Sequence, residues 1–217
     1  MKMKKKIKTS AFFAIGLLAA FVFWTLLVRF VDVSPIGPQG SSVGIATLNE
    51  AVHRMTGVYM TLYELTDWLG LIPILVALGF GVLGLVQWIQ RKSIAKVDRS
   101  ILALGVFYVV VVAVFLLFEK VVINYRPVLI DGVLEASYPS STTLLVMCVI
   151  PTAMMQFHMR IKNPTIRRIV LLGCGVFLTF MVIGRLLSGV HWVTDIVGGL
   201  LLSAGLVTAY SVWGDGK

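Results

Sequence analysis

A short stretch near the C-terminus, residues 184–195, holds three side chains that could do chemistry together. His191 and Asp195 are four residues apart, a spacing that places both on one face of a helix. A carboxylate in that position can hold an imidazole in one tautomer and orientation. Arg185 stands just upstream, and an oriented imidazole beside a guanidinium suits nucleophilic attack on phosphorus. These residues alone are equally compatible with a structural role, in which the histidine only caps the end of a membrane helix.

A serine-threonine cluster opens one of the apolar runs of the chain. Pro139-Ser140-Ser141-Thr142 directly precedes that run, which is typical of a helix N-terminus with a serine as N-cap. Free backbone N–H groups and the positive end of the helix dipole make such a terminus an oxyanion-binding element. A simple helix cap would explain this cluster equally well if it stood alone.

A third polar stretch, residues 119–127, carries Lys120 and Arg126 at the end of another apolar run. Charge in that place is costly unless it is used. With Arg185, Arg126 could bind phosphate oxygens in a bidentate manner. The conjunction of three such stretches favours a phosphate site over three unrelated helix ends.

The composition shows which elements must position these residues. The chain is 58% hydrophobic and its mean hydropathy is +0.93, values typical of polytopic membrane proteins. We predict an all-α protein with a single integral membrane domain, residues 1–217. Between the first two spans, residues 32–60 should form an extracytoplasmic loop and a short amphipathic helix with His53 on its wet face. The six expected spans are about 11–31, 68–89, 101–118, 141–158, 169–183 and 196–213.

The formal charge of +9 is distributed as a topology signal. Lysines crowd the N-terminus, and further basic residues cluster in 91–99 and 160–168, at alternate ends of successive apolar runs. This positive-inside pattern argues against a nucleic-acid partner and for two cytoplasmic termini. The three polar stretches then meet at the outer face. Cys148 and Cys174 fall in apolar runs as packing residues, and we expect no metal or cofactor.

The three polar stretches resemble the motifs of the type 2 phosphatidic acid phosphatase superfamily, which includes membrane lipid phosphate phosphatases. Its third motif, Ser-Arg-x5-His-x3-Asp, is matched by Arg185, His191 and Asp195. Its first, Lys-x6-Arg-Pro, is matched by Arg126 and the proline after it, and its second, Pro-Ser-Gly-His, by Pro139-Ser140 only. The resemblance implies that His191 is a nucleophile that forms a phosphohistidine and that Asp195 supports it. It also implies that both arginines and Ser140 bind phosphate, without a metal.

Three positions depart from the family's pattern. Gly184 replaces the motif serine, and Glu119 stands where the first motif has lysine. Lys120 is one residue away, about 100° of rotation on a helix. Thr142 replaces the second-motif histidine, the family's general acid, and a threonine hydroxyl cannot protonate a leaving oxygen at neutral pH.

The lack of the second-motif histidine as general acid affects which substrate is expected, because it limits which leaving groups can depart. An alkoxide is about as basic as hydroxide, whose conjugate acid has a pKa of about 15.7, whereas phosphate has a second pKa of about 6. A lipid diphosphate therefore needs less help from an acid than a monoester. We expect a metal-independent phosphatase of an isoprenoid diphosphate such as undecaprenyl diphosphate, in a bacterial plasma membrane. Ser141, Thr142 and Lys120 are further candidates for substrate binding.

Two alternatives use the same residues. A degenerate family member could bind phospholipid headgroups without turning them over, and a phosphotransferase could pass the phosphoryl group to another lipid or sugar. A transporter is disfavoured, since no span carries a charge in mid-membrane. The sequence leaves the oligomeric state open.

Overall fold

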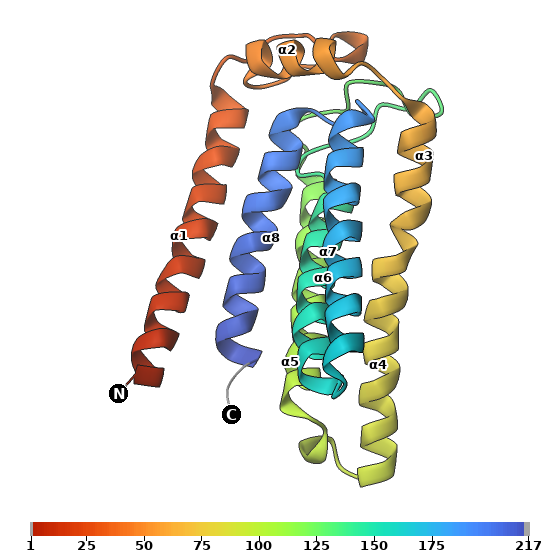
Figure 1. The fold of residues 1–217 in the computed structure, drawn as a ribbon. Coiled ribbons are helices and arrows are strands. Elements are labelled where there is room, and N and C mark those ends of the chain that lie inside the picture. The colour runs from red at the N-terminus through yellow and green to blue at the C-terminus, as the bar shows by residue number, and fades with distance from the viewer. Residues whose placement is uncertain (1, 215–217) are drawn as a thin grey trace.

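Long helices standing side by side make up the fold, with one short helix across one end (Figure 1). The computed structural model describes residues 2–214, and no sheet forms among them. The helices are α1 (Lys2–Phe30), α2 (Ala46–Thr56), α3 (Met60–Leu69), α4 (Leu71–Arg91), α5 (Arg99–Lys120), α6 (Ser141–Arg160), α7 (Pro164–Leu187) and α8 (Val193–Gly214), with single 3-10 turns η1 (Pro38–Gly40) and η2 (Ile94–Lys96).

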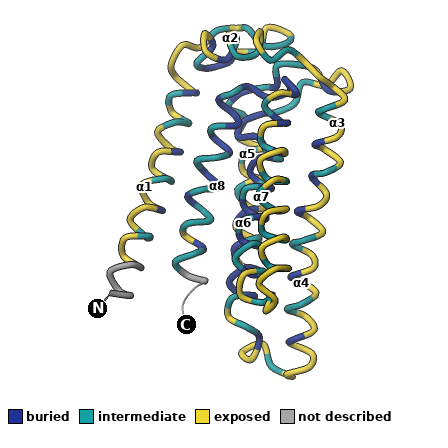
Figure 2. The backbone as a smooth tube through the Cα atoms, in the orientation of Figure 1, coloured by how far each residue is buried: buried dark blue, intermediate teal, exposed yellow. Residues whose placement is uncertain are grey.

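Within residues 2–214, six helical segments are long and apolar enough to cross a membrane, which confirms the predicted all-α polytopic architecture. The share of buried residues in the most apolar window is 56% for α6 and 50% for α8, against 17–28% for the other spans, so α6 and α8 form the centre. Many apolar residues of the outer helices are exposed, and Figure 2 marks exposed residues along α1 and α4. Such surfaces suit contact with lipid tails. The segments are Lys8–Phe30, Met60–Arg91, Arg99–Lys120, Ser141–Arg160, Pro164–Leu187 and Val193–Val212.

The second span begins earlier than the sequence suggested. We expected it near residue 68, but α3 starts at Met60 and passes into α4 at Gly70, whose N–H bonds to the carbonyl oxygens of Thr66 and Asp67. The polar residues of α3 lower its hydropathy without breaking the helix, since neither Gly nor Pro occurs among them. These polar side chains therefore enter the bundle on a helix.

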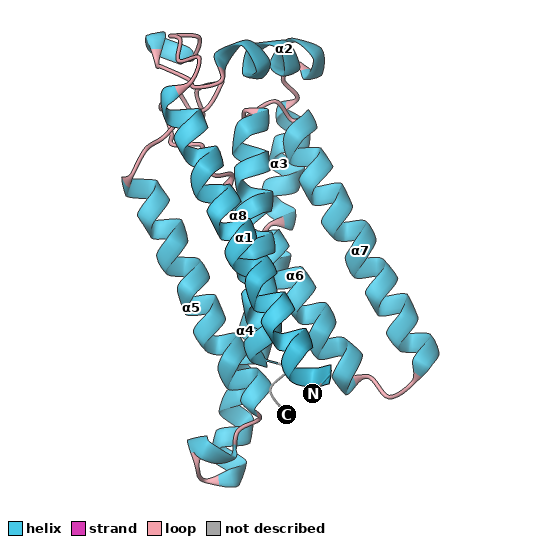
Figure 3. Cartoon of the chain, turned by 90° about the vertical axis from the view of Figure 1, so that its left-hand side faces the viewer, coloured by secondary structure: helices cyan, strands magenta, loops and turns pink. Residues whose placement is uncertain are grey.

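Helix α2 lies across the end of the bundle where α3 begins and α7 ends (Figure 1, Figure 3). The fully buried Asn49 attaches it to the start of α8. Asn49 Nδ2 donates to Thr194 Oγ1 at 2.9 Å and to the Gly44 carbonyl at 2.8 Å, and Asn49 Oδ1 accepts from the Thr194 N–H at 3.2 Å. The amide thus satisfies polar groups at the N-terminus of α8.

The expectation that His53 lies on a wet face was wrong. The ring is half-buried and packs against Trp192, with 5.3 Å between the ring centroids. Burial lowers the pKa of His53. Because α2 lies flat on the bundle end, the face that carries His53 is turned toward the protein.

The start of α1, the end of α8 and both basic loops lie at the opposite end from α2 (Figure 1, Figure 3). The side chains of the lysines before Lys8 and the last three residues lie outside the described part of the chain. This common end agrees with the predicted topology. Its assignment to the cytoplasm stays a prediction from the charge pattern.

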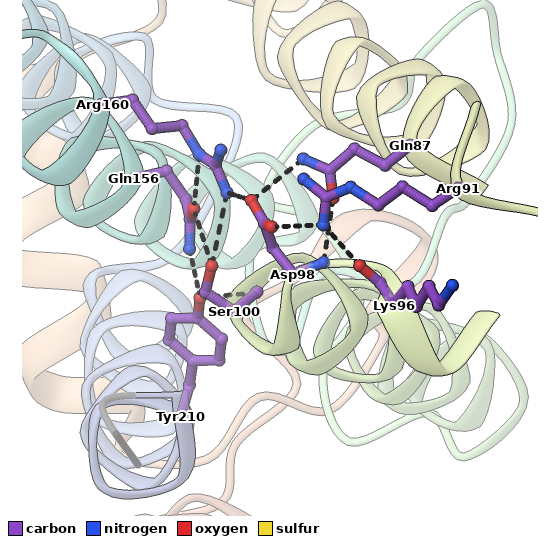
Figure 4. Close-up of polar contacts among 8 residues, drawn as sticks. All are labelled: Gln87, Arg91, Lys96, Asp98, Ser100, Gln156, Arg160 and Tyr210. Carbon is purple, nitrogen blue, oxygen red and sulfur yellow. Dashed lines mark hydrogen bonds and ion pairs between the residues drawn. The ribbon is translucent and has the colours of Figure 1, made fainter. Parts of the chain in front are cut away.

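Asp98 organises the polar contacts of that common end (Figure 4). Asp98 Oδ2 accepts from Gln87 Nε2 at 2.9 Å and from Arg160 Nη2 at 3.0 Å, and Oδ1 accepts from Arg91 Nη1 at 3.0 Å. Partial burial raises the pKa of Asp98, but these hydrogen bonds outweigh it and hold the pKa below its usual value. One carboxylate therefore connects α4, α5 and α6 where their ends meet water.

We predict that Asp98→Asn lowers the thermal unfolding midpoint of the protein in detergent. The substitution weakens three charge-assisted hydrogen bonds at a partly exposed site, so the expected loss is about 1–2 kcal/mol. Asp131→Asn, at an exposed loop position, is the control and should melt like the wild type. Equal midpoints for the two variants would contradict the role given to Asp98.

Candidate active site

The carboxylate of Asp195 joins two of the three polar stretches. It is fully buried in the first turn of α8. Its Oδ2 accepts from Ser137 Oγ at 2.7 Å and from the Trp192 N–H at 2.9 Å. Its backbone carbonyl accepts from the Ser140 N–H at 3.1 Å. The loop before α6 and the turn before α8 are thereby held together.

His191 lies in that turn, just before α8 rather than on it. Its Nδ1 is 3.7 Å from Asp195 Oδ2, a separation that is longer than a hydrogen bond. Its Nε2 is 3.4 Å from Arg126 Nη1. Catalytic contacts are often loose without substrate. With the proton on Nδ1, toward Asp195, the lone pair of Nε2 faces the Arg126 guanidinium, where a phosphate would lie.

Electrostatics keep this imidazole neutral. Burial is the largest cause that lowers the pKa of His191 well below its usual value, and the charges of Arg126 and Arg185 lower it further. A neutral imidazole has the free lone pair that a nucleophile needs. The neutral imidazole is thus the form of His191 expected near neutral pH.

Arg126 enters the site from the α5–α6 connection and is 8% exposed. The backbone N–H of Arg126 donates to the backbone carbonyl of Glu135 at 3.0 Å. Its side-chain Nε forms a 2.9 Å ion pair with Glu135 Oε2. The Glu135 side chain is 42% exposed. A local turn therefore orients the guanidinium and supplies a counter-ion that an incoming phosphate can replace.

Arg185, in the last turn of α7, is almost fully buried against α3. Its Nη1 donates to the Tyr63 carbonyl and to Thr66 Oγ1, each at 3.3 Å, and its Nη2 is 3.5 Å from Asp67 Oδ1. The guanidinium carbon lies 4.7 Å from the centroid of the Tyr63 ring, and that of Arg126 lies 5.9 Å from it. One aromatic ring thus contacts both guanidiniums.

Sequence reasoning missed these α3 residues. Tyr63, Thr66 and Asp67 have the spacing i, i+3, i+4, which places them on one helix face. The available signal was this polar stripe directly before an apolar run. It was overlooked because the helix was expected to start after it.

The close approach of α3 and α7 explains Gly184. A Cβ at this position would lie 2.9 Å from Thr66 Cγ2. The threonine therefore occupies the space of the motif serine, and its hydroxyl meets Arg185. The hydroxyl group that the motif serine would supply is thus supplied by Thr66 of the neighbouring helix α3.

The serine-threonine cluster divides between two places. Ser140 is fully buried and caps α6, accepting a long 3.5 Å hydrogen bond from the Thr143 N–H. Ser141 and Thr142 are half-buried and line a cavity of about 480 Å³ together with Asp67 and apolar residues of α4, α5 and α6. The cap explanation is correct for Ser140, while its neighbours border a space for a ligand.

Lys120 is exposed at the end of α5, and the described part of the chain shows no hydrogen bond or ion pair from it to another motif residue. The structure thus assembles His191, Asp195, Arg126, Arg185 and Ser140 but leaves Lys120 aside. Among residues 2–214, no group of three or more His, Cys, Asp and Glu side chains could hold a metal ion.

Within residues 2–214, six apolar helices are long enough to cross a membrane, and a buried His–Arg–Arg–Asp cluster lies at one end of their bundle, as expected for an integral membrane protein that acts on phosphate groups. A family model described as PAP2 superfamily matches residues 104–217. The chain belongs to the PAP2 superfamily, as its motifs predicted. This membership supports a membrane lipid phosphatase, which is a phosphoric ester hydrolase.

One solved structure resembles this chain over most of its length. The crystal structure of the first transmembrane PAP2 type phosphatidylglycerolphosphate phosphatase from Bacillus subtilis has a TM-score of 0.62 and 18% sequence identity, and the match covers 91% of this chain and 94% of that one. At this identity, the likeness concerns the fold. Comparison with curated proteins gave no match.

We predict that His191 binds a proton only well below pH 6.5, the usual pKa of histidine. Arg126→Gln removes one of the positive charges that lower this pKa, so it should move the titration to higher pH. Nitrogen-15 NMR of histidine-labelled protein in detergent measures the titration of His191 in the wild type and in Arg126→Gln, and His191→Ala assigns the signal.

Arg167→Gln, at the other end of α7, is the matched control and should leave the titration unchanged. A His191 that titrates near pH 6.5 in the wild type would contradict the buried, neutral imidazole.

Proposed function

We propose that this protein is a metal-independent lipid diphosphate phosphatase that acts through a phosphohistidine at His191. The observation that carries the proposal is the buried imidazole placed between Asp195 and Arg126. Arg126 and Arg185 would bind the terminal phosphate, and the free N–H groups at the start of α6 would add donors. Nε2 would attack phosphorus, and water would then release phosphate from the imidazole.

Two features support a lipid diphosphate as the substrate. Thr142 replaces the acid that a poor leaving group requires, and a leaving phosphate is far less basic than an alkoxide. The cavity beside Thr142 is lined mainly by apolar side chains of three membrane helices, among them Leu71, Val112 and Leu145. It suits the first part of a lipid chain, with the headgroup at its polar rim. Undecaprenyl diphosphate fits this description.

The charge pattern supports the location. By the positive-inside rule, the basic loops would put the end opposite α2 in the cytoplasm, so the site would face outward in a bacterial plasma membrane. Helix α2 would then cover the site from the aqueous side, while the substrate arrives from the lipid phase.

The test is phosphate release by the purified protein in detergent without added metal. We expect undecaprenyl diphosphate to be hydrolysed faster than phosphatidic acid or phosphatidylglycerol phosphate. His191→Ala should lose at least about 10³-fold, because the nucleophile is removed. His158→Ala, an exposed histidine at the other end of the bundle, should keep full activity.

Other outcomes would identify the alternatives. Equal rates for wild type and His191→Ala on all three lipids would indicate a headgroup-binding protein. Transfer of labelled phosphate to a lipid or sugar, in place of free phosphate, would indicate a phosphotransferase. A clear preference for a monophosphate would overturn the proposed substrate.

A further inference from the structure

The site as described has a nucleophile and phosphate ligands but no group that can give a proton to the leaving oxygen. Thr142, at the position of the family's acid, cannot do so. The cavity that Thr142 lines contains one ionisable side chain among its described lining residues, Asp67. That carboxyl group therefore shares a space with the position where the acid is missing.

Asp67 stands between the phosphate ligands and this cavity. On one side, its Oδ1 is 3.5 Å from Nη2 of Arg185. On the other, it borders the cavity together with Ser141 and Thr142. The Asp67 side chain is 59% exposed, whereas that of Arg185 is 1% exposed. The carboxyl group is therefore free to turn toward a ligand, while the arginine is held in place.

We propose that Asp67 is a catalytic residue that donates the proton to the leaving oxygen of the substrate, in place of the second-motif histidine. The proposal rests on the proposed function and adds to it the residue that acts as general acid. It also makes a monoester a slower substrate rather than an impossible one.

Substrate binding would prepare this acid. A phosphate bound to Arg185 takes over the partner of Asp67 and adds negative charge beside it, within a largely apolar cavity. The other ionisable groups nearby include Tyr63 and Glu64, one helical turn earlier on α3, and Glu119, which lines a small adjoining cavity next to Ser141.

The reaction has two steps, formation of the phosphohistidine and its hydrolysis, and every proton and bond is accounted for. In the first, a bond forms between Nε2 of His191 and phosphorus, the bond from phosphorus to the leaving oxygen breaks, and this oxygen takes the proton of Asp67. In the second, the Asp67 carboxylate accepts a proton from water, the water oxygen bonds to phosphorus, and the phosphorus–nitrogen bond breaks. Asp67 and His191 end as they began.

The test compares Asp67→Asn with wild type on three substrates that differ in leaving group. Phosphatidic acid must expel an alkoxide, undecaprenyl diphosphate expels a phosphate, and p-nitrophenyl phosphate expels a phenolate that leaves unprotonated. Loss of an acid should lower kcat for phosphatidic acid by about 10²-fold or more. The loss should be smaller for the diphosphate and within about 3-fold for the nitrophenyl ester.

Two further variants separate proton donation from positioning. Glu135→Gln removes the carboxylate that pairs with the other site arginine, and it should change all three rates by one common factor. Adding Thr142→His to Asp67→Asn should restore hydrolysis of phosphatidic acid, because it returns the family's acid.

Four results would overturn the proposal. Asp67→Asn could lower all three rates equally, which would mean that Asp67 only holds Arg185. The added histidine could fail to restore the monoester rate. The wild type could hydrolyse the diphosphate but no monoester above His191→Ala, and this result would leave the proposed function standing. A wild type inactive on every substrate would overturn both.

Discussion

The whole site depends on one buried carboxylate. An ionised Asp195 at the end of an apolar bundle would be strongly unfavourable without hydrogen-bond partners. Ser137 Oγ and the Trp192 N–H both donate to it, and the same residue accepts the Ser140 N–H through its backbone. These hydrogen bonds bring the loop before α6 and the turn before α8 to one place. Because His191 lies in that turn, the imidazole is positioned by the same contacts.

The two site arginines follow a similar rule. Each buried guanidinium pairs with a carboxylate that is itself partly exposed, Arg126 with Glu135 and Arg185 with Asp67. These pairs keep two positive charges acceptable in a low dielectric without substrate. Because neither carboxylate is buried, the phosphate of the proposed substrate could replace both of them. Under the proposed function, this arrangement would suit the exchange of counter-ions rather than permanent ion pairs.

Helix α2 and the loops around it complete the site from the aqueous side. Asn49 fastens α2 to the start of α8, and the Tyr59 N–H donates to the Ser188 carbonyl at 2.9 Å. Gly189 has a φ of +69°, and a Cβ there would lie 1.9 Å from the Gly57 carbonyl oxygen, so only glycine allows this approach. The segment without family motifs is therefore part of the architecture around His191.

The sequence by itself determined the helical class, the number of spans and the family, because apolar runs and motif spacing are local properties. It also named His191, Asp195, Arg126 and Arg185. It missed Tyr63, Thr66 and Asp67, and it suggested a site role for Lys120 and a wet face for His53. Those points depend on which helices pack together and on how a helix is rotated, and only the tertiary structure decides them. Because α3 packs against α7, Thr66 supplies a hydroxyl to Arg185 where the family motif has a serine, and Asp67 pairs with Arg185. No local sequence pattern encodes contacts between segments this far apart in the chain.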